Sequence, residues 1–273
     1  MVRHVIIACS AQKKKSEGAR HVWSNQLTES QWIQIISKEK KTYTPESLYT
    51  GQHFIGQKKL IHEQGDRLWI ASAGLGLLNG DVESPDLVPS YDAAFTKKYG
   101  SNTESWSSLP FGGLNRLLES DGDIVIAVPI QYQKAIIADI NFKHISERVI
   151  ALGPGPLREQ SNVTPTPYHP RMSEKKVLGG QKLALFTKLL EAFYEDATHF
   201  SVLFEAVAKA ESLPPPVLRK KIPSQIELDE IVENLPTHIT SGGAAVRYIR
   251  DVLRRSASQE RILMSWREAR KPK

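Results

Sequence analysis

The sequence predicts an α/β fold: a mostly parallel four-stranded sheet with helices on both faces, followed by a small basic helical module. Four short runs rich in Val and Ile are typical of buried strands, at residues 4–9, 67–72, 123–129 and 147–152. Helical patterns lie before or between these runs, at residues 28–39, 51–64, 109–119 and 131–140. Because strands that alternate with helices pair in parallel, the expected architecture is an αβα sandwich.

The chain after the fourth strand predicts a long loop and then a helical end to the first domain. Residues 153–180 contain five prolines and exceed the usual length of a connection, which is typical of a functional or a disordered loop. Apolar residues then repeat at helical spacing over 183–193, and a second helix is expected at 199–210.

A proline-rich segment predicts the domain boundary. Three consecutive prolines, Pro214 to Pro216, are followed by a basic run, a composition typical of a linker. We therefore predict an α/β domain that holds the chemistry over residues 1–212 and a basic helical module over 213–273. Three helices are expected in this module, near residues 223–234, 243–256 and 258–269.

The excess positive charge is concentrated at the end of the chain. The whole chain has a net charge of +6, and residues 240–273 contain nine Lys or Arg against three Asp or Glu. The first 239 residues contain 27 charged residues of each sign. This asymmetry favours a polyanionic partner, and we expect a nucleic acid, DNA rather than RNA.

Composition excludes several classes of protein. No apolar run reaches the roughly 18 residues of a membrane span, and the chain opens on a strand-like run, so a cytosolic protein is expected. The single cysteine, Cys9, excludes an internal disulfide. We predict no metal site and no nucleotide cofactor, because metal-ligand spacings and glycine-rich phosphate motifs are missing. No obligate protein partner is inferred.

Small and basic residues follow the first strand. Cys9 and Ser10 begin a turn that continues to Lys13, Lys14 and Lys15. At the carboxyl edge of a parallel sheet, such a turn is a candidate site for a phosphate or an anionic substrate. The alternative is a solvated lysine run beside a buried cysteine.

Small residues, a tyrosine and a carboxylate follow the second strand. Three small residues at its end are candidates for contact with a substrate: Ser72, Gly74 and Gly76. Further along, Tyr91 offers a stacking surface and Asp92 a carboxylate. Asp92 could instead cap a helix that begins at Ala93.

The long loop after the fourth strand contains a histidine followed by a proline. His169 in a rigid loop at the carboxyl edge could donate a hydrogen bond to a leaving base. The alternative is a surface histidine in a tethering loop.

Four sequence blocks, in order, resemble a known domain family. They are C-S-x-x-K at residues 9–13, L-Y-x-G-x-x-F at 48–54, S-A-x-x-G-L at 72–77 and P-x-Y-D at 89–92. Together they cover roughly residues 4–95 and resemble the core domain of archaeosine synthase and the phage-defence modified-base DNA glycosylases of the Brig type. The last block departs from the family's P-Y-D by the inserted Ser90. The resemblance implies that Tyr49, like Tyr91, contributes to substrate binding.

The predicted topology resembles a second group of enzymes. Four parallel strands with a His169-Pro170 loop beyond the last one are similar to the uracil-DNA glycosylase superfamily, in which a histidine-proline loop approaches the flipped nucleotide. The acidic motif after the first strand of those enzymes is missing here. A glycosidic mechanism therefore needs a carboxylate from elsewhere, and Asp92 is the candidate, with Asp81 as the alternative.

These observations lead to one functional hypothesis and two alternatives. The hypothesis is a DNA N-glycosylase that flips out a modified base and excises it, leaving an abasic site, in defence against phage. Asp92 would stabilise the oxocarbenium-like sugar, and His169 or Lys13 would stabilise the departing base. The alternatives are a group-transfer enzyme on a modified base in tRNA or DNA, and a nucleic-acid-binding protein without catalysis.

The basic tail predicts a surface for the nucleic-acid backbone. On a helix over 243–256, Arg247, Arg250 and Arg254 share one face, and Val246, Ile249 and Leu253 form the neighbouring apolar stripe. Ahead of it, Gly242 and Gly243 offer free amides that could bind a phosphate. The alternative is an ordinary solvated helix.

Overall fold

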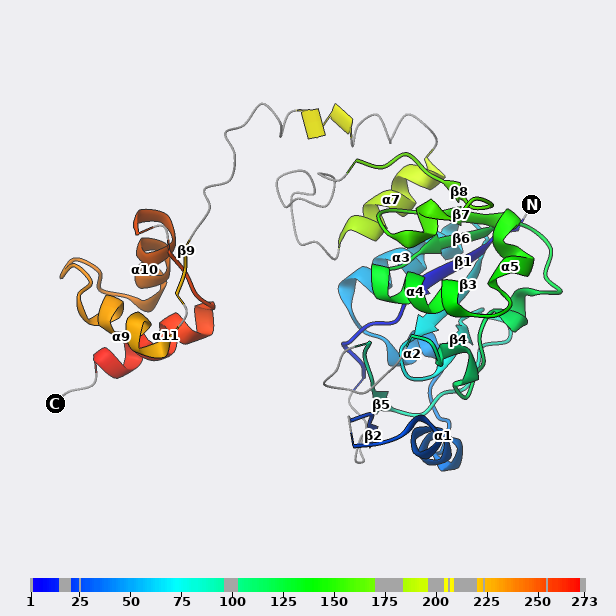
Figure 1. Cartoon of the computed structure of the whole chain (residues 1–273), viewed down its shortest axis with the longest axis horizontal. Helices are drawn as coiled ribbons and strands as arrows, with labels where there is room; N and C mark the ends of the chain where they lie inside the picture. Colours follow the sequence, from blue (N-terminus) through cyan, green and yellow to red (C-terminus); the bar gives the residue numbers. More distant parts are fainter. Residues whose placement is uncertain are drawn as a thin grey trace. The chain divides into compact units, whose positions relative to one another are not determined.

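The computed structural model describes residues 2–14, 21–24, 26–95, 103–169, 184–195, 204–205, 207–208, 220–222, 224–253 and 255–270. The chain divides into two compact units, Met1–Ala210 and Glu211–Lys273 (Figure 1). No helix within the described ranges combines the length and the apolar character needed to cross a membrane.

The first unit is an α/β domain with a mixed sheet of six strands in the order β4-β3-β1-β6-β7-β8. These strands are β1 His4–Ala8, β3 Arg67–Ser72, β4 Gly76–Asn79, β6 Ile124–Ala127, β7 Val149–Ala151 and β8 Thr164–Pro165. All neighbouring pairs are parallel except β3 and β4, which are antiparallel. The mostly parallel sheet is confirmed, whereas the expectation of four strands is wrong.

The two additional strands, β4 and β8, are short, and the sequence pattern of neither one predicts a separate strand. β4 follows β3 through a tight turn, so its apolar residues continue the run of the preceding strand instead of standing apart. β8 has two residues, one of which is Pro165, and proline is tolerated at the edge of a sheet because no donor is needed there. Neither strand gives a periodic signal long enough to be recognised.

β1 is the central strand and explains the position of the core. It pairs in parallel with β3 on one side and with β6 on the other. Val5, Ile6 and Ile7 are completely buried, as expected for a strand covered on both faces of the sheet. The continuous apolar run in the sequence is therefore a direct consequence of burial on two sides.

Helices cover both faces of this sheet. The α-helices of the first unit are α1 Glu29–Lys38, which lies beside β2 (Figure 1), and α2 Pro45–Leu48, α3 Gln52–Glu63, α4 Ile130–Ala138, α5 Phe142–Ile145 and α7 Leu185–Tyr194. α3 packs against β1, β3 and α7. The connection through α3 moves from β1 to β3, and the one through α4 moves the opposite way, from β6 to β7. Because such connections are right-handed, α3 and α4 lie on opposite faces (Figure 1).

Two of the predicted helical regions differ from the structure. Residues 109–119 form a loop with a short 3₁₀ turn, Leu114–Leu117, because Pro110, Gly112 and Gly113 interrupt the helical pattern. Ala93 does not begin a helix: Tyr91–Asp92 is a short strand, β5, paired with β2 His21–Val22, and the described residues that follow are not helical. Of the expected helix at 199–210, only residues 204–205 and 207–208 are described, and they are helical.

The second unit contains the three expected helices and a small core. The helices are α9 Gln225–Glu233, α10 Gly242–Arg247 and α11 Gln259–Ala269, and β9 Lys220–Lys221 pairs in parallel with β10 Arg255–Ser256. Its core includes the buried side chains of Leu228, Val232, Ile249, Ile262 and Trp266.

After α10 the helix widens into a π-helical turn, Tyr248–Val252. The wider turn changes the angle between successive side chains, so the predicted apolar stripe does not continue along one face. Val246 and Ile249 are buried, but Leu253 is 39% exposed. The part of the prediction that placed Leu253 in this stripe is wrong.

A buried histidine joins β1 to β3 and to the loop before β6. His4 is 2% exposed, and its Nδ1 accepts a hydrogen bond from Trp69 Nε1 at 3.0 Å. Its Nε2 therefore bears the proton and donates to the carbonyl of Asp121 at 3.1 Å. Burial lowers the pKa of His4 below its ordinary value of 6.5, which keeps the ring neutral.

We expect His4 to make the fold sensitive to acid. Since the folded pKa is lowered, the unfolded chain binds more protons, and stability falls as the pH drops below about 6.5. One such group changes the free energy of unfolding by at most about 1.4 kcal/mol per pH unit. Urea unfolding of His4→Gln between neutral and acidic pH is expected to show a shallower decrease than the parent protein. The control is His144→Gln, since His144 is an exposed residue of α5, and an unchanged slope in His4→Gln would contradict the prediction.

Candidate functional site

The carboxyl edge of the sheet is the candidate site. The parallel strands β1, β3, β6 and β7 all end there, and the strand order reverses direction between β1 and β6. In open α/β sheets, ligands bind at such a reversal, outside the carboxyl ends of the strands. The segments that follow these strands are therefore described in turn.

The turn after β1 is fixed by the segment between α2 and α3. Lys13 and Tyr49 form an isolated antiparallel bridge, and Lys14 N donates to Leu48 O at 2.7 Å. Ser10 is completely buried and its Oγ accepts from Gln12 N at 3.0 Å. Any side chain at Gly51 would overlap Ser10, so this glycine permits the close approach. The L-Y-x-G block thus supports the C-S-x-x-K block directly.

Lys13 is buried beside Asp92. Its side chain is 1% exposed, and its Nζ lies 3.6 Å from Oδ1 of Asp92, whose side chain is 34% exposed. The ammonium also lies over the rings of Tyr91 and Tyr49, at 4.8 and 5.8 Å from their centroids. The carboxylate and the two ring faces compensate a charge that has lost its water. The expectation of a solvated lysine is therefore wrong for Lys13, and Lys15 lies outside the described residues.

Below this ion pair lies a chain of buried hydroxyl groups. Tyr91 Oη is 2.5 Å from both Tyr49 Oη and Ser72 Oγ. Ser72 Oγ accepts from the backbone amides of Gly74 and Leu75, so its own proton is left to donate to Tyr91, and Tyr91 in turn donates to Tyr49. Burial raises the pKa of both phenols well above the usual range, so they remain neutral.

The burial of the two tyrosines limits what they can do. Tyr91 is 0% exposed and Tyr49 is 1% exposed. In this structure, neither ring presents a free face on which a base could stack. Their contacts with Lys13 indicate that they position the ion pair instead.

Neighbouring protein atoms occupy the space in which a side chain at Gly74 or Gly76 would lie. A Cβ atom at Gly74 would lie 2.6 Å from the Cβ of Ala93 and 2.9 Å from the Tyr91 ring, so only glycine allows β5 to approach. A Cβ at Gly76 would collide with the carbonyl of Gly112. The structure therefore gives these glycines a packing role where the sequence predicted contact with a ligand.

Two tryptophans hold the loop after β3 in place. Trp32 Nε1 donates to Gly74 O at 2.6 Å, and Trp106 Nε1 donates to Ser72 O at 2.8 Å. Trp32 also stacks on Trp23, with 5.3 Å between ring centroids. These residues were not predicted as part of the site, because isolated tryptophans in a sequence do not reveal which carbonyl they will reach.

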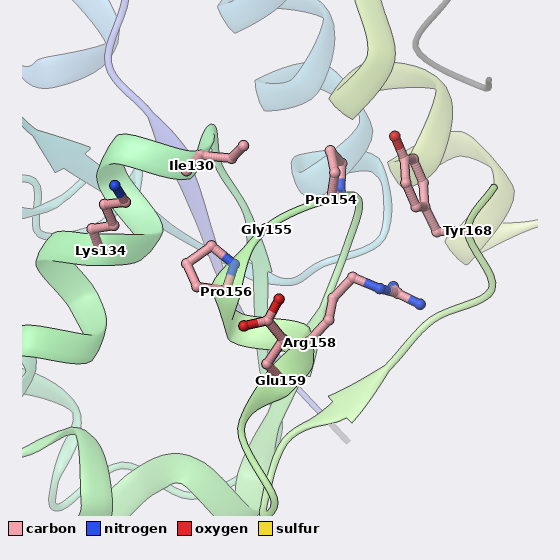
Figure 2. A pocket seen from close by; sticks show the side chains of 8 residues that line it. All are labelled: Ile130, Lys134, Pro154, Gly155, Pro156, Arg158, Glu159 and Tyr168. Carbon is pink, nitrogen blue, oxygen red and sulfur yellow. The ribbon is translucent and has the colours of Figure 1, made fainter. Parts of the chain in front are cut away.

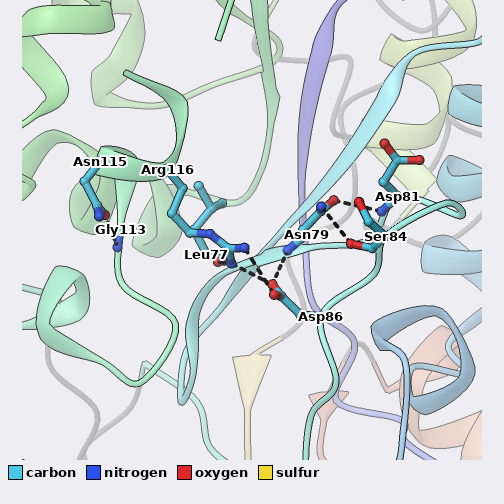
Figure 3. A network of polar contacts seen from close by, with 8 residues as sticks. All are labelled: Leu77, Asn79, Asp81, Ser84, Asp86, Gly113, Asn115 and Arg116. Carbon is cyan, nitrogen blue, oxygen red and sulfur yellow. Dashed lines mark hydrogen bonds and ion pairs between the residues drawn. The ribbon is translucent and has the colours of Figure 1, made fainter. Parts of the chain in front are cut away.

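The second candidate carboxylate, Asp81, lies beside a polar network around Asn79 (Figure 3). β4 runs antiparallel to β3 and pairs Asn79 with Trp69, so Asp81 is carried back toward the amino edge of the sheet. There Arg116 donates to both carboxylate oxygens of Asp86, at 2.6 and 3.1 Å, and Asp86 accepts from Asn79 N. Of the two candidates, Asp92 is therefore the one that lies with Lys13.

Cys9 contacts α4 across the strand reversal. Its Sγ lies 3.3 Å from Tyr132 Oη, and Phe95 packs edge-on against the Tyr132 ring at 4.8 Å. Cys9 is 9% exposed. The thiol thus behaves as a small packed side chain with one polar contact.

A pocket of about 500 Å³ lies where β6 and β7 end (Figure 2). It is formed by the first turn of α4, the Pro154–Pro156 loop and Tyr168. His169 is the next residue; it follows the edge strand β8, three positions from β1 in the sheet. At roughly 4.8 Å per strand, β8 lies about 14 Å from β1. The contacts that join Lys13, Asp92, Tyr49, Tyr91 and Ser72 do not include His169.

The predicted backbone-binding residues of the second unit have different surroundings. Arg247 is exposed, whereas Arg250 donates to Ala257 O at 3.2 Å, and Arg254 lies outside the described residues. Ser241 caps α10 by accepting from Ala244 N. Gly242 packs against Leu263 at the first position of the helix, and Gly243 borders open space.

Replacing Tyr91 by Phe is expected to destabilise the first unit without changing its fold. The variant leaves Tyr49 and Ser72 without their shared partner, which costs about 1–3 kcal/mol for a buried polar group. Chemical denaturation is the measurement. The control is Tyr43→Phe, since the described part of the chain gives the Tyr43 hydroxyl no hydrogen bond. Equal stabilities for the two variants would show that the hydroxyl chain contributes little.

Comparison with protein-family models, with curated proteins and with solved structures gave no match. The two resemblances drawn from the sequence blocks and the topology therefore stay predictions, and the site is assigned on its geometry alone.

Proposed function

We propose that this protein is a DNA N-glycosylase that removes a modified base and leaves an abasic site. The observation that supports the proposal is the ion pair between buried Lys13 and partly exposed Asp92 at the carboxyl edge of the sheet. When the glycosidic bond breaks, the sugar develops positive charge and the departing base develops negative charge. A carboxylate and an ammonium that lie side by side can each stabilise one of these charges.

The chemistry assigns a separate task to each charge. In hydrolysis, water adds to the anomeric carbon of the sugar, the bond to the base nitrogen breaks, and the base leaves with a proton. The sugar becomes oxocarbenium-like, so a carboxylate on its face lowers the barrier. Asp92 has about a third of its side chain exposed and can meet a nucleotide that has been flipped out of the helix.

Lys13 is assigned to the departing base. Its ammonium is fixed by two tyrosine rings, so little reorganisation accompanies the reaction. His169 is the second candidate for this role. A nucleotide that contacts both His169 and Asp92 would have to span the distance between β8 and β1. We also propose that Arg247 of the second unit contacts the DNA backbone, because its side chain is exposed.

Asp92→Asn is expected to reduce base excision at least about a hundredfold and to leave DNA affinity nearly unchanged. The reason is that the carboxylate stabilises charge that exists mainly in the transition state. The assay incubates the protein with unmodified and phage-modified DNA and then applies alkali, which cleaves at abasic sites.

The matched control is Asp81→Asn, which removes a carboxylate near the amino edge of the sheet. It is expected to retain full activity. If Asp92→Asn keeps normal activity at normal stability, Asp92 is not catalytic. If no DNA yields abasic sites with the parent protein, the glycosylase proposal itself fails.

Two arginine variants test the proposed contact with DNA. Arg247→Gln is expected to reduce the salt dependence of DNA binding by about one phosphate contact, equally for all sequences. Arg250→Gln is expected instead to lower the thermal stability of the second unit, because its guanidinium bonds Ala257 O. Binding titrations over a range of salt, with thermal unfolding, distinguish the two. An unchanged slope for Arg247→Gln would remove this residue from the binding surface.

A further inference from the structure

The pocket at the ends of β6 and β7 has a fixed shape. Gln133 of α4 donates from Nε2 to Val128 O at 3.0 Å and to Pro154 O at 2.8 Å, and its Oε1 accepts from Leu157 N. Gly155 has a φ of +136°, and any side chain there would collide with Gln133. Buried Gln133 thus fixes the loop after β7, which forms part of the pocket, to helix α4.

The two ends of this pocket differ chemically (Figure 2). Lys134, on α4, stands at one end. Arg158 and Tyr168 stand at the other, with the guanidinium 5.6 Å from the ring centroid and held by Thr166 O at 2.7 Å. Between them lie the apolar surfaces of Ile130, Pro154 and Pro156.

We propose that this pocket binds one nucleotide that carries a single phosphate. The planar base would lie on the apolar surface toward Arg158 and Tyr168, and the phosphate would reach Lys134. A volume of about 500 Å³ suits a ligand of this size. A fixed guanidinium and an aromatic ring are the groups on which bases stack.

The charge of the pocket limits the number of phosphates. Lys134 and Arg158 supply two positive charges, and Glu159, which also lines the pocket, supplies one negative charge. The net charge of the lining is +1, which equals in size the charge of a phosphodiester and is closer to that of a monophosphate, about −1.5 to −2 at pH 7, than to that of a triphosphate. The inference goes beyond the proposed function, because binding a nucleotide here requires no bond to break.

Calorimetric titration of the whole chain tests the proposal, with thymidine, thymidine monophosphate and a short oligothymidylate as ligands. Thymidine monophosphate is expected to bind about tenfold more tightly than thymidine. Lys134→Gln is expected to abolish this difference, and Tyr168→Leu to weaken both ligands by a similar factor. Lys143→Gln is the matched control and should change nothing, because Lys143 is an exposed residue of α5 and does not line the pocket.

Equal affinities for thymidine and its monophosphate, or a difference that survives in Lys134→Gln, would overturn the proposal. The oligonucleotide identifies the source of the ligand: tighter binding than the monophosphate, again dependent on Lys134, indicates a strand, and weaker binding indicates a free nucleotide. If no abasic sites form in any DNA but the dependence on Lys134 persists, the proposed function fails and the nucleotide site stands.

Discussion

The burial of one ammonium group is the constraint on which the carboxyl edge of the sheet depends. The Lys13 side chain is 1% exposed, and a charge removed from water destabilises the fold unless other groups compensate it. Asp92 supplies the opposite charge, and the rings of Tyr49 and Tyr91 supply their negative faces. Three segments that are distant in the sequence must therefore meet at this point. The same requirement places the partly exposed carboxylate of Asp92 beside a fixed cation.

The groups around the ion pair are held by backbone contacts more than by surface side chains. Two tryptophans donate to the carbonyls of Ser72 and Gly74, and Ser72 in turn accepts two backbone amides. Such contacts remove freedom from the loop after β3, so the residues around the ion pair are held in one arrangement. The buried hydroxyl chain has the same effect, because Ser72, Tyr91 and Tyr49 are joined by a series of short hydrogen bonds.

The two edges of the sheet differ in their use of polar groups. At the amino edge, His4, Asp66 and Arg3 bond the backbone and one another, and Tyr194 of α7 donates to Asp66 at 3.0 Å. At the carboxyl edge, the charges of Asp92, Lys134 and Arg158 lie at partly exposed positions or line a pocket. This division agrees with the general rule that α/β sheets bind ligands at their carboxyl edge.

The sequence by itself determined the elements that depend on local pattern. Continuous apolar runs located β1, β3, β6 and β7, because a strand covered on both faces needs no alternation. Helical periodicity located α1, α3, α4, α7 and the three helices of the second unit. Lys13 belongs to the C-S-x-x-K block and Asp92 to the P-x-Y-D block, so the sequence singled out the two residues separately.

Only the tertiary structure decided which residues meet. β4 and β8 are too short to give a sequence pattern, and each is defined by its pairing with the preceding strand of the sheet. A lysine beside two others in sequence resembles a solvated run, yet Lys13 is buried because Tyr49 and Tyr91 close over it. The guanidinium of Arg250 donates to Ala257 O, so this side chain is already engaged within the second unit. Position 74 requires glycine because β5 approaches it closely. Burial and non-local contact set these outcomes, and neither is encoded in the spacing of residues along the chain.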